Sequence, residues 1–355
     1  MKVVPALKWF HNWVGFFISI TMLIVLTTGV YLGGMDILKR IEDHGQTFVA
    51  LNTAEKAHIL HSIFERYPQM SSVRFPTEYS PYIEAATRGK SIVLDTQLNE
   101  LAIHANHNIA LYSTMFWLHR NFLLDDVGKY TNAWASLAGG LITLVGIYLW
   151  WRVRKAFRLK HSIPTDTRSS SLLKSHIQLG LFISVPLFIL CISGFLITYK
   201  GLWTDYLQHQ TEETVNYSSA RPNDWLSQLE TAQNLWPQAI LVSVNKPRIS
   251  TDENIQPTDL IYSIRFDSHS DVWLRQADNI TINYNTGEIQ SALKHSDRAL
   301  SGRIASFVRP LHDALNMPLS YVVLITSISI VAIFILLFST VTFYRRTFKS
   351  KTATR

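Results

Sequence analysis

The sequence predicts a membrane α-helical bundle with four transmembrane helices, built from two similar halves, and two α+β domains outside the membrane. Three observations support this fold class. Only 17% of the 355 residues are charged, whereas soluble domains contain about 25%. Four long stretches contain no Asp, Glu, Lys or Arg, which is typical of membrane spans. The first and third of these stretches also resemble each other, which indicates an internal repeat.

The four charge-free stretches are each long enough to cross a bilayer. A helix needs about 20 apolar residues to cross roughly 30 Å of hydrocarbon. The first stretch could instead be a signal peptide, but it is longer than an h-region and residues 33–36 form a poor cleavage site. We therefore expect an uncleaved helix. The predicted spans are residues 9–35, 131–151, 175–199 and 314–344.

Positive charges predict which side of the membrane each segment faces. The N-terminus, the loop between the second and third spans and the C-terminal tail contain 14 Lys and Arg residues and one acid, a net charge of +13. Since the whole chain carries +7, the remaining segments carry −6. The positive-inside rule then places both termini and the loop on the cytoplasmic side of a bacterial inner membrane. The charge thus indicates orientation in a lipid bilayer and no nucleic-acid partner.

The long segments between spans are therefore expected in the periplasm. The predicted segments, in chain order, are the cytoplasmic end with the first helix (1–35), a first periplasmic domain (36–130), the second helix (131–152), a basic cytoplasmic loop (153–174), the third helix (175–199), a second periplasmic domain (200–313), the fourth helix (314–344) and a cytoplasmic tail (345–355).

Each periplasmic segment has the pattern of a small α+β unit. Helical periodicity covers residues 53–67 in the first segment and 223–235 in the second. Strand-like runs follow each helix, and residues 285–287 have the composition of a turn. The expected strands are 70–75, 80–87, 90–95, 239–245, 259–266, 271–276 and 279–284.

The first and third spans align at an offset of 165 residues (176 minus 11). LKWFHNWVGFFIS (7–19) matches LLKSHIQLGLFIS (172–184), so His11 corresponds to His176. Gly15 and Gly180 also correspond. They follow the histidines by one helical turn on the same face, where a glycine leaves room for a flat macrocycle.

A second pair of histidines precedes the second and fourth spans. FWLHR (116–120) and VRPLHD (308–313) place His119 beside His312. The order of span, α+β segment, histidine and span thus occurs twice. Such an order is typical of a parallel repeat about an axis along the membrane normal.

These four histidines are the candidate metal ligands. An ionisable side chain at the end of a membrane helix is costly without a partner, so a functional role is expected. Neutral imidazole is the commonest metal ligand, and haem iron takes axial ligands from opposite faces. We therefore expect two bis-histidine haem sites, His11 with His176 and His119 with His312. Alternatively, His11 and His176 are interfacial residues that hydrogen-bond to lipid headgroups.

Two arginines are candidate cofactor-binding residues, and the absence of several motifs excludes other classes of site. Arg120 and Arg309 lie near the second histidine pair, where they could bind haem propionates or be ordinary interfacial charges. The single cysteine, Cys191, excludes a disulfide framework and Cys-based zinc or iron–sulfur sites. No G-x-G-x-x-G, P-loop or G-x-S-x-G motif occurs. Electrons would therefore come from quinol or from a cytoplasmic reductase.

The chain resembles the PepSY-associated transmembrane proteins over nearly its whole length. The matching pieces are LKWFHNWVGFFIS with LTTGVYL, WLHRNFLL with GIYLWW, LLKSHIQLGLFIS with ISG, and INYNTGEI followed by VRPLHDALN. Within that family it looks like the FoxB-like ferric-siderophore reductases, which are inner-membrane di-haem proteins. The resemblance implies two periplasmic PepSY-like domains and two b-type haems on His11, His119, His176 and His312. In the first of these domains Asn99 departs from the pattern, because the second has Gly287 there.

The expected function is that of an oxidoreductase in the inner membrane. Electrons would pass from the donor to the His11/His176 haem, then to the His119/His312 haem, and finally to a ferric siderophore or another iron chelate. The alternative is a non-redox, membrane-anchored PepSY protein that binds or inhibits a periplasmic protease or senses a ligand. A third possibility is electron transfer to another periplasmic partner.

Overall fold

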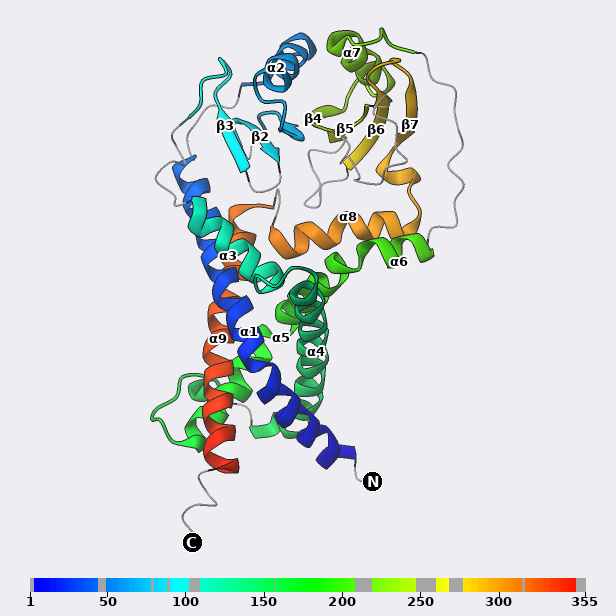
Figure 1. Ribbon diagram of the computed structural model, residues 1–355. Coiled ribbons are helices and arrows are strands. Elements are labelled where there is room, and N and C mark those ends of the chain that lie inside the picture. The colour runs from blue at the N-terminus through cyan, green and yellow to red at the C-terminus, as the bar shows by residue number, and fades with distance from the viewer. Residues whose placement is uncertain are drawn as a thin grey trace. The chain divides into compact units, whose positions relative to one another are not determined.

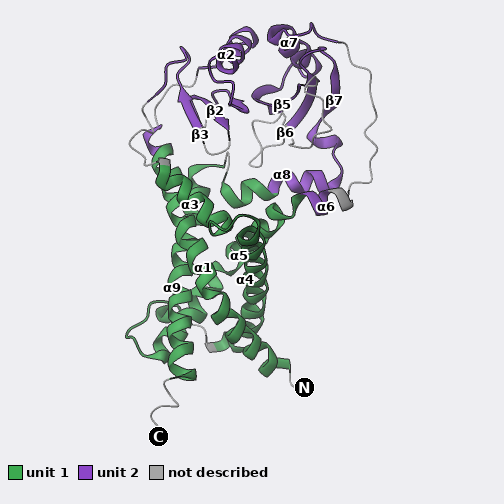
Figure 2. Ribbon diagram, viewed as in Figure 1, with its two compact units in different colours: residues 1–39, 110–200, 308–355 green, residues 40–109, 201–307 purple. Residues whose placement is uncertain are grey.

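The computed structural model describes most of the chain as two compact units, shown in different colours in Figure 2. The helical unit comprises residues 1–39, 110–200 and 308–355, and the sheet unit comprises residues 40–109 and 201–307. The described residues are 3–43, 49–77, 80–87, 90–101, 109–156, 158–207, 219–246, 260–267, 277–314 and 317–348.

Four long apolar helices form the helical unit, which confirms the predicted spans (Figure 1). Each is long and apolar enough to cross a membrane, so the chain has the make-up of a multi-pass membrane protein. Their mean hydropathies lie between 1.6 and 2.8 over the most apolar 18-residue windows. The helices are α1 (Val3–Glu42), α4 (Asp125–Val153), α5 (Ser169–Thr198) and α9 (Leu319–Thr347).

The helix ends differ from the charge-free stretches that predicted them. All four helices continue past those stretches at one or both ends, because charged residues such as Lys39 and Arg152 are compatible with helix outside the apolar run. The fourth begins later than expected. Ala314 has a left-handed φ of 56° and cannot continue a helix there, and Pro318 is the N-cap of α9.

Small residues let these helices approach closely. A Cβ atom on Gly139 of α4 would lie 3.2 Å from Sδ of Met22 in α1 and 3.3 Å from Sγ of Cys191 in α5. A Cβ atom on Gly33 of α1 would collide with Oγ1 of Thr326 in α9. Glycine at such contacts is characteristic of membrane helix packing.

Two shorter helices carry the second pair of histidines, and the sequence analysis did not predict them. They are α3 (Ile109–Asn121) and α8 (Leu300–Asp313). Near its end α3 is tied to the following span, because the Asn132 amide donates hydrogen bonds to the carbonyls of His119 and Arg120, at 2.7 and 3.2 Å. The end of α8 is tied to α9 in the same way, because the Tyr321 hydroxyl of α9 donates a hydrogen bond of 2.6 Å to the Leu311 carbonyl of α8. The remaining short helices are α6 (Lys200–Leu207), η2 (Arg154–Ala156), η3 (Leu159–His161) and η4 (His295–Asp297).

The sheet unit contains one antiparallel sheet of seven strands in the order β3-β2-β1-β4-β5-β6-β7. Its strands are β1 (Ser72–Arg74), β2 (Ile83–Thr87), β3 (Lys90–Leu94), β4 (Ile240–Asn245), β5 (Ile261–Asp267), β6 (Ala277–Asn283) and β7 (Ile289–Leu293). Strand β1 belongs to the first extramembrane segment and β4 to the second, and they pair with Val73 opposite Val244. The two segments that we expected as separate domains thus contribute to one sheet.

Two helices share a single hydrophobic core with this sheet, α2 (Thr53–Arg66) and α7 (Trp225–Leu235). They agree with the helices predicted over 53–67 and 223–235. Leu60 of α2 and Leu229 of α7 are fully buried, as are alternate residues of the strands such as Ile264 and Ile280. This alternation is the pattern of strands with one face in a core.

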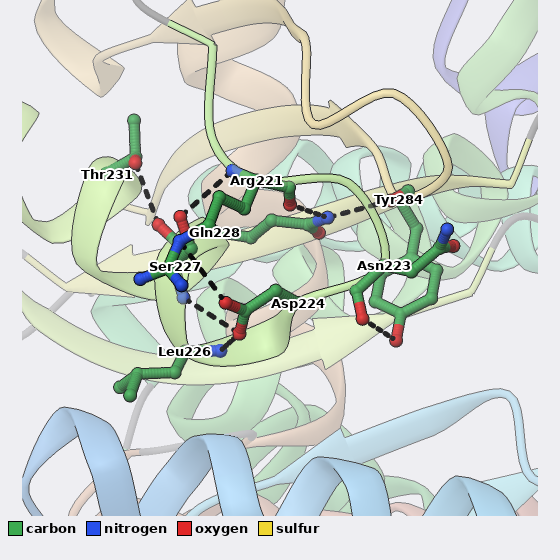
Figure 3. Close-up of polar contacts among 8 residues, drawn as sticks. All are labelled: Arg221, Asn223, Asp224, Leu226, Ser227, Gln228, Thr231 and Tyr284. Atoms are coloured by element: carbon green, nitrogen blue, oxygen red, sulfur yellow. Dashed lines mark hydrogen bonds and ion pairs between the residues drawn. The ribbon is translucent and has the colours of Figure 1, made fainter.

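The start of α7 is fixed by polar contacts that join it to the β6–β7 hairpin (Figure 3). The Asp224 side chain caps the helix by accepting from the amides of Leu226 and Ser227. The Gln228 amide donates to the carbonyls of Arg221 and Tyr284, at 3.2 and 2.7 Å. These bonds hold the loop before α7 against the turn of the hairpin.

Six of the expected strands correspond to β1–β6. The expected run 271–276 lies outside the described residues, and β7 was not expected. Gly287 has a φ of 73°, as its predicted turn requires. In the first segment the left-handed residue is Leu98, with a φ of 65°, and not Asn99, which the alignment had placed opposite Gly287. The Asp95 carboxylate accepts from the amides of Gln97 and Asn99 and so shapes this turn.

Candidate functional site

The structure brings the predicted histidine partners together inside the helical unit. The ring centroids of His11 in α1 and His176 in α5 are 6.1 Å apart. Those of His119 in α3 and His312 in α8 are also 6.1 Å apart. Each pair therefore joins one residue from the first half of the chain to its equivalent in the second half.

Backbone carbonyls fix which ring nitrogen each histidine presents. Nδ1 of His11 lies 3.2 Å from the Ile142 oxygen. Nδ1 of His119 lies 2.9 Å from the Val25 oxygen, and Nδ1 of His312 lies 3.1 Å from the Leu190 oxygen. Because a carbonyl oxygen only accepts, Nδ1 must carry the proton, and Nε2 then keeps the lone pair that can bind a metal ion.

His176 has a weaker version of the same arrangement. The Ile335 carbonyl of α9 acts on its ring as a backbone acceptor. No hydrogen-bond partner of normal geometry reaches its Nδ1 from the described part of the chain. His176 is thus held less firmly than His11, although both face a carbonyl of the span that ends their own half.

The carbonyls stand at equivalent positions in the two halves. Val25 and Leu190 are 165 positions apart (190 minus 25), the same offset as His11 and His176. Ile142 and Ile335 are 193 positions apart (335 minus 142), and so are His119 and His312 (312 minus 119). Both the imidazoles and the acceptors that orient them therefore follow the repeat seen in the sequence.

Among the described residues, hydroxyl groups contact the Nδ1 atoms of the second pair but not those of the first. Thr28 Oγ1 lies 3.1 Å from Nδ1 of His119, and Ser193 Oγ lies 3.0 Å from Nδ1 of His312. Thr28 and Ser193 are again 165 positions apart. Each of these Nδ1 atoms thus has a carbonyl and a hydroxyl as neighbours.

Glycines set the space around the rings. A Cβ atom on Gly29 would lie 3.3 Å from Cε1 of His119, and one on Gly194 would lie 3.1 Å from Cε1 of His312. Gly146 has the same relation to His11, at 3.2 Å. These glycines allow the imidazoles to lie directly against the neighbouring helix.

Gly15 and Gly180 are different, because they border open space. A Cβ atom on either one would meet no other described atom within 4 Å, once its own helix backbone is set aside. They lie one helical turn after His11 and His176, on the same faces. Open space therefore borders both glycines, and its use by a planar group remains a prediction.

The two pairs lie at different levels of the bundle. On α1, His11 and the Val25 acceptor of the second pair are 14 residues apart (25 minus 11), and on α5 His176 and Leu190 are also 14 apart (190 minus 176). At 1.5 Å per residue this is roughly 21 Å along the helix, which fits within a bilayer core of about 30 Å.

Desolvation favours the neutral form of both rings in the second pair. The pKa of His119 is lowered to about 4 by burial and then by the neighbouring His312. Burial likewise lowers the pKa of His312, against the opposing effect of Asp313. The lowered pKa values favour the neutral imidazole, which is the form that binds a metal ion.

The two arginines have partners within the protein. Nε of Arg309 lies 2.9 Å from the Asp313 carboxylate, one helical turn away in α8. The Arg120 guanidinium lies over the Trp117 ring, with 5.4 Å between Cζ and the ring centroid. Both side chains are exposed, so their propionate-binding role remains a prediction.

The chemistry of the site depends on the number of protein ligands. Among the described residues no group of three or more His, Cys, Asp and Glu side chains could hold a metal ion. A zinc site needs three or four protein ligands. Two imidazoles alone suit a metal ion whose other ligands come from a planar cofactor.

Sequence reasoning missed Thr28, Ser193, Gly29, Gly194 and Gly146 as parts of the site. A signal for four of them was present, because a hydroxyl residue followed by glycine occurs in Thr28-Gly29 and in Ser193-Gly194 at the offset of 165. Gly146 has no such counterpart, since serine stands 193 positions later at Ser339.

The fold and the site define a multi-pass membrane protein with two pairs of part-buried histidines between its helices. Residues 8–346 match the family described as the PepSY-associated TM region. The chain belongs to this family, as the sequence resemblance predicted. Comparison with curated proteins found no match.

Proposed function

We propose that the protein is an electron-transfer protein of the bacterial inner membrane that binds two b-type haems and reduces ferric siderophores to release Fe(II) in the periplasm. The observation that carries this proposal is the repeated pairing of imidazoles, His11 with His176 and His119 with His312, each with ring centroids 6.1 Å apart. Family membership agrees with a membrane protein of this kind.

The spacing of the rings suits one metal ion between them. A metal–imidazole bond is about 2.0–2.1 Å long and the bonding nitrogen lies about 1.2 Å from the ring centre, so two rings on opposite sides of one ion have centres roughly 6.4 Å apart. The observed 6.1 Å is close to this value. The open space beside Gly15 and Gly180 supports a planar group at the first pair.

Bound haem would supply reversible one-electron chemistry. The chain's own residues would provide the axial nitrogens, hold the rings in one tautomer through the Ile142, Val25 and Leu190 carbonyls, and keep water away by packing the imidazoles against glycines. The levels of the two pairs, roughly 21 Å apart, provide a route for electrons across most of the membrane.

The proposed reaction takes electrons from quinol or from a cytoplasmic reductase and gives one electron to each ferric chelate. Hydroxamate and catecholate oxygens are hard ligands that prefer Fe(III). Reduction to Fe(II) therefore weakens the chelate and releases the metal. The protein would act as an oxidoreductase whose substrate is the chelated iron.

Haem content and spectra test the cofactor. Purified full-length protein should show b-type bands in a reduced-minus-oxidised spectrum and contain two haems per chain. His11→Ala and His119→Ala should each remove about half of the haem absorbance, whereas His58→Ala, at an exposed position of α2, should remove none. A haem content near zero would overturn the redox proposal and favour a PepSY protein that binds a protease or senses a ligand.

A second measurement tests the substrate. Reduced protein is mixed without oxygen with a ferric hydroxamate and a colorimetric Fe(II) chelator. Haem should be reoxidised as the Fe(II) complex appears, with one Fe(II) complex formed for each haem that is oxidised. Reoxidation only by a protein partner, and by no ferric chelate, would show that the electrons go elsewhere.

A further inference from the structure

We propose that the hydroxyl groups of Thr28 and Ser193 make the imidazoles of His119 and His312 stronger electron donors than those of His11 and His176. The haem at the His119–His312 pair would then have the lower reduction potential of the two. This inference rests on the proposed haem sites and adds a role for two residues that are not metal ligands.

The geometry gives each Nδ1–H of the second pair two acceptors. His119 Nδ1 lies 2.9 Å from the Val25 carbonyl and 3.1 Å from Thr28 Oγ1. His312 Nδ1 lies 3.1 Å from the Leu190 carbonyl and 3.0 Å from Ser193 Oγ. The carbonyl and the hydroxyl lie three residues apart on one helix, in α1 and in α5 alike.

The hydroxyls act as acceptors because their own hydrogens are already used. Thr28 Oγ1 donates to the carbonyls of Ile24 and Val25, at 2.8 and 2.9 Å. Ser193 Oγ donates to the Leu190 carbonyl, at 3.1 Å. A hydroxyl has one hydrogen and two lone pairs, so the oxygen that faces each imidazole presents a lone pair to Nδ1–H.

The first pair lacks this second acceptor. His11 Nδ1 has the Ile142 carbonyl at 3.2 Å, and His176 Nδ1 has no partner of normal hydrogen-bond geometry among the described residues. The second pair thus has the richer set of acceptors in both of its rings, and the difference is the same in the two halves of the chain.

Hydrogen-bond acceptors at Nδ1–H change the strength of Nε2 as an electron donor to the metal ion. A hydrogen bond donated by Nδ1 moves electron density onto the ring and raises the basicity of the ligating nitrogen. A more basic axial ligand stabilises Fe(III) over Fe(II), and hydrogen bonding around the ligand is one of the means by which proteins set haem potentials. The His119–His312 site would therefore be the stronger one-electron reductant.

The test measures haem midpoint potentials by spectroelectrochemical titration of full-length protein. The variants are Thr28→Val, which keeps the side-chain shape without the hydroxyl, Ser193→Ala and the double variant. They are made in the wild-type chain and in a His11→Ala chain, where the His119–His312 haem remains as the single signal. Thr28→Ser restores the hydroxyl. Ser19→Ala and Ser184→Ala are matched controls, because these buried serines of α1 and α5 donate to the carbonyls of Phe16 and Leu181.

The expected result is a higher midpoint potential of the His119–His312 haem in each single variant and a larger rise in the double variant. Thr28→Ser and both controls should keep the wild-type value, and the His11–His176 haem should not change. An unchanged potential, an equal shift of both haems, or loss of haem in place of a shift would overturn the inference. Absence of haem from the wild-type protein would refute the proposed function itself. Two haems whose potentials do not change in the variants would refute only the role of the hydroxyl groups.

Discussion

Val73 lies directly opposite Val244 where strand β1 pairs with strand β4, and both side chains are fully buried. This contact joins the strands of the two extramembrane segments, which are more than 100 positions apart in the sequence. The neighbouring residues of the two strands are joined by a hydrogen bond of 2.7 Å from Ser72 Oγ to Asn245 Oδ1. Because one core serves both segments, damage to either side of this junction should unfold both.

Val244→Asp tests this coupling. An unpaired carboxylate at a fully buried position costs several kcal/mol, so limited proteolysis should cut the first and second extramembrane segments together and faster than in the wild type. Ile240→Asn in the same strand is the control, because Ile240 is 51% exposed, and its cleavage should match the wild type. Cleavage of the second segment alone would show that the two halves fold independently.

Gly287→Ala should destabilise the β6–β7 hairpin. Gly287 has a φ of 73°, and an added Cβ atom would collide with the Ala220 carbonyl oxygen. We expect a loss of roughly 2–4 kcal/mol in the free energy of unfolding of the sheet unit, from backbone strain and displacement of the loop before α7. Chemical denaturation followed by tryptophan fluorescence measures it, since Trp225 and Trp236 are in this core. Gly201→Ala, where a Cβ atom meets no described atom within 4 Å, should behave as the wild type.

Gly15→Leu and Gly180→Leu should remove the haem at the His11–His176 pair. Both positions border open space, since an added Cβ atom would meet no other described atom within 4 Å, and a leucine side chain would extend into the volume proposed for the macrocycle. The haem absorbance should fall by about half, as in His11→Ala, while the protein stays folded by circular dichroism.

Gly34→Leu is the control for these glycine variants. A Cβ atom on Gly34 of α1 also meets no described atom within 4 Å, but this residue is remote in sequence from His11 and Gly15. It should leave the haem content unchanged. Full haem content in Gly15→Leu would mean that the planar group does not use the space beside this turn.

Lys56 should make the stability of the sheet unit rise with pH. Its ammonium group donates to the Leu241 carbonyl at 3.2 Å, and burial lowers its pKa from 10.5 to about 8. The unfolded chain therefore binds more protons between about pH 8 and 10.5, so the free energy of unfolding increases across that range, by up to roughly 3 kcal/mol.

Thermal unfolding of full-length protein in detergent, from pH 7.5 to 10.5, measures this effect. Lys56→Met cannot titrate, and its Tm should rise less over this range than that of the wild type. Lys294→Met replaces an exposed lysine of the same unit and should keep the wild-type dependence. If Tm depends on pH in the same way in Lys56→Met and in the wild type, Lys56 is not the source of the pH dependence.

The spans and the histidine pairs could be predicted from the sequence, because both leave a signal in side-chain chemistry. A bilayer excludes charge over a fixed length, so the stretches without Asp, Glu, Lys or Arg marked α1, α4, α5 and α9. The repeat then indicated which histidines are equivalent, and the structure places His11 beside His176.

Other parts of the site leave no such signal. The acceptors that orient the rings are backbone carbonyls of Val25, Leu190 and Ile142, whose side chains are ordinary apolar residues of a span. Likewise, the sequence predicts a strand over residues 70–75 but does not indicate which strand it pairs with. The pairing of β1 with β4 depends on tertiary packing of two distant segments.

The order of the paired histidines along the chain has a consequence for biogenesis. Each histidine pair takes one member from each half, so no pair can meet while only the first half has been made. His176 leaves the ribosome long before His312, and the first pair can close as soon as α5 has entered the membrane beside α1. The second pair must wait for α8, near the end of synthesis. The chain order therefore allows the His11–His176 pair to form before the His119–His312 pair.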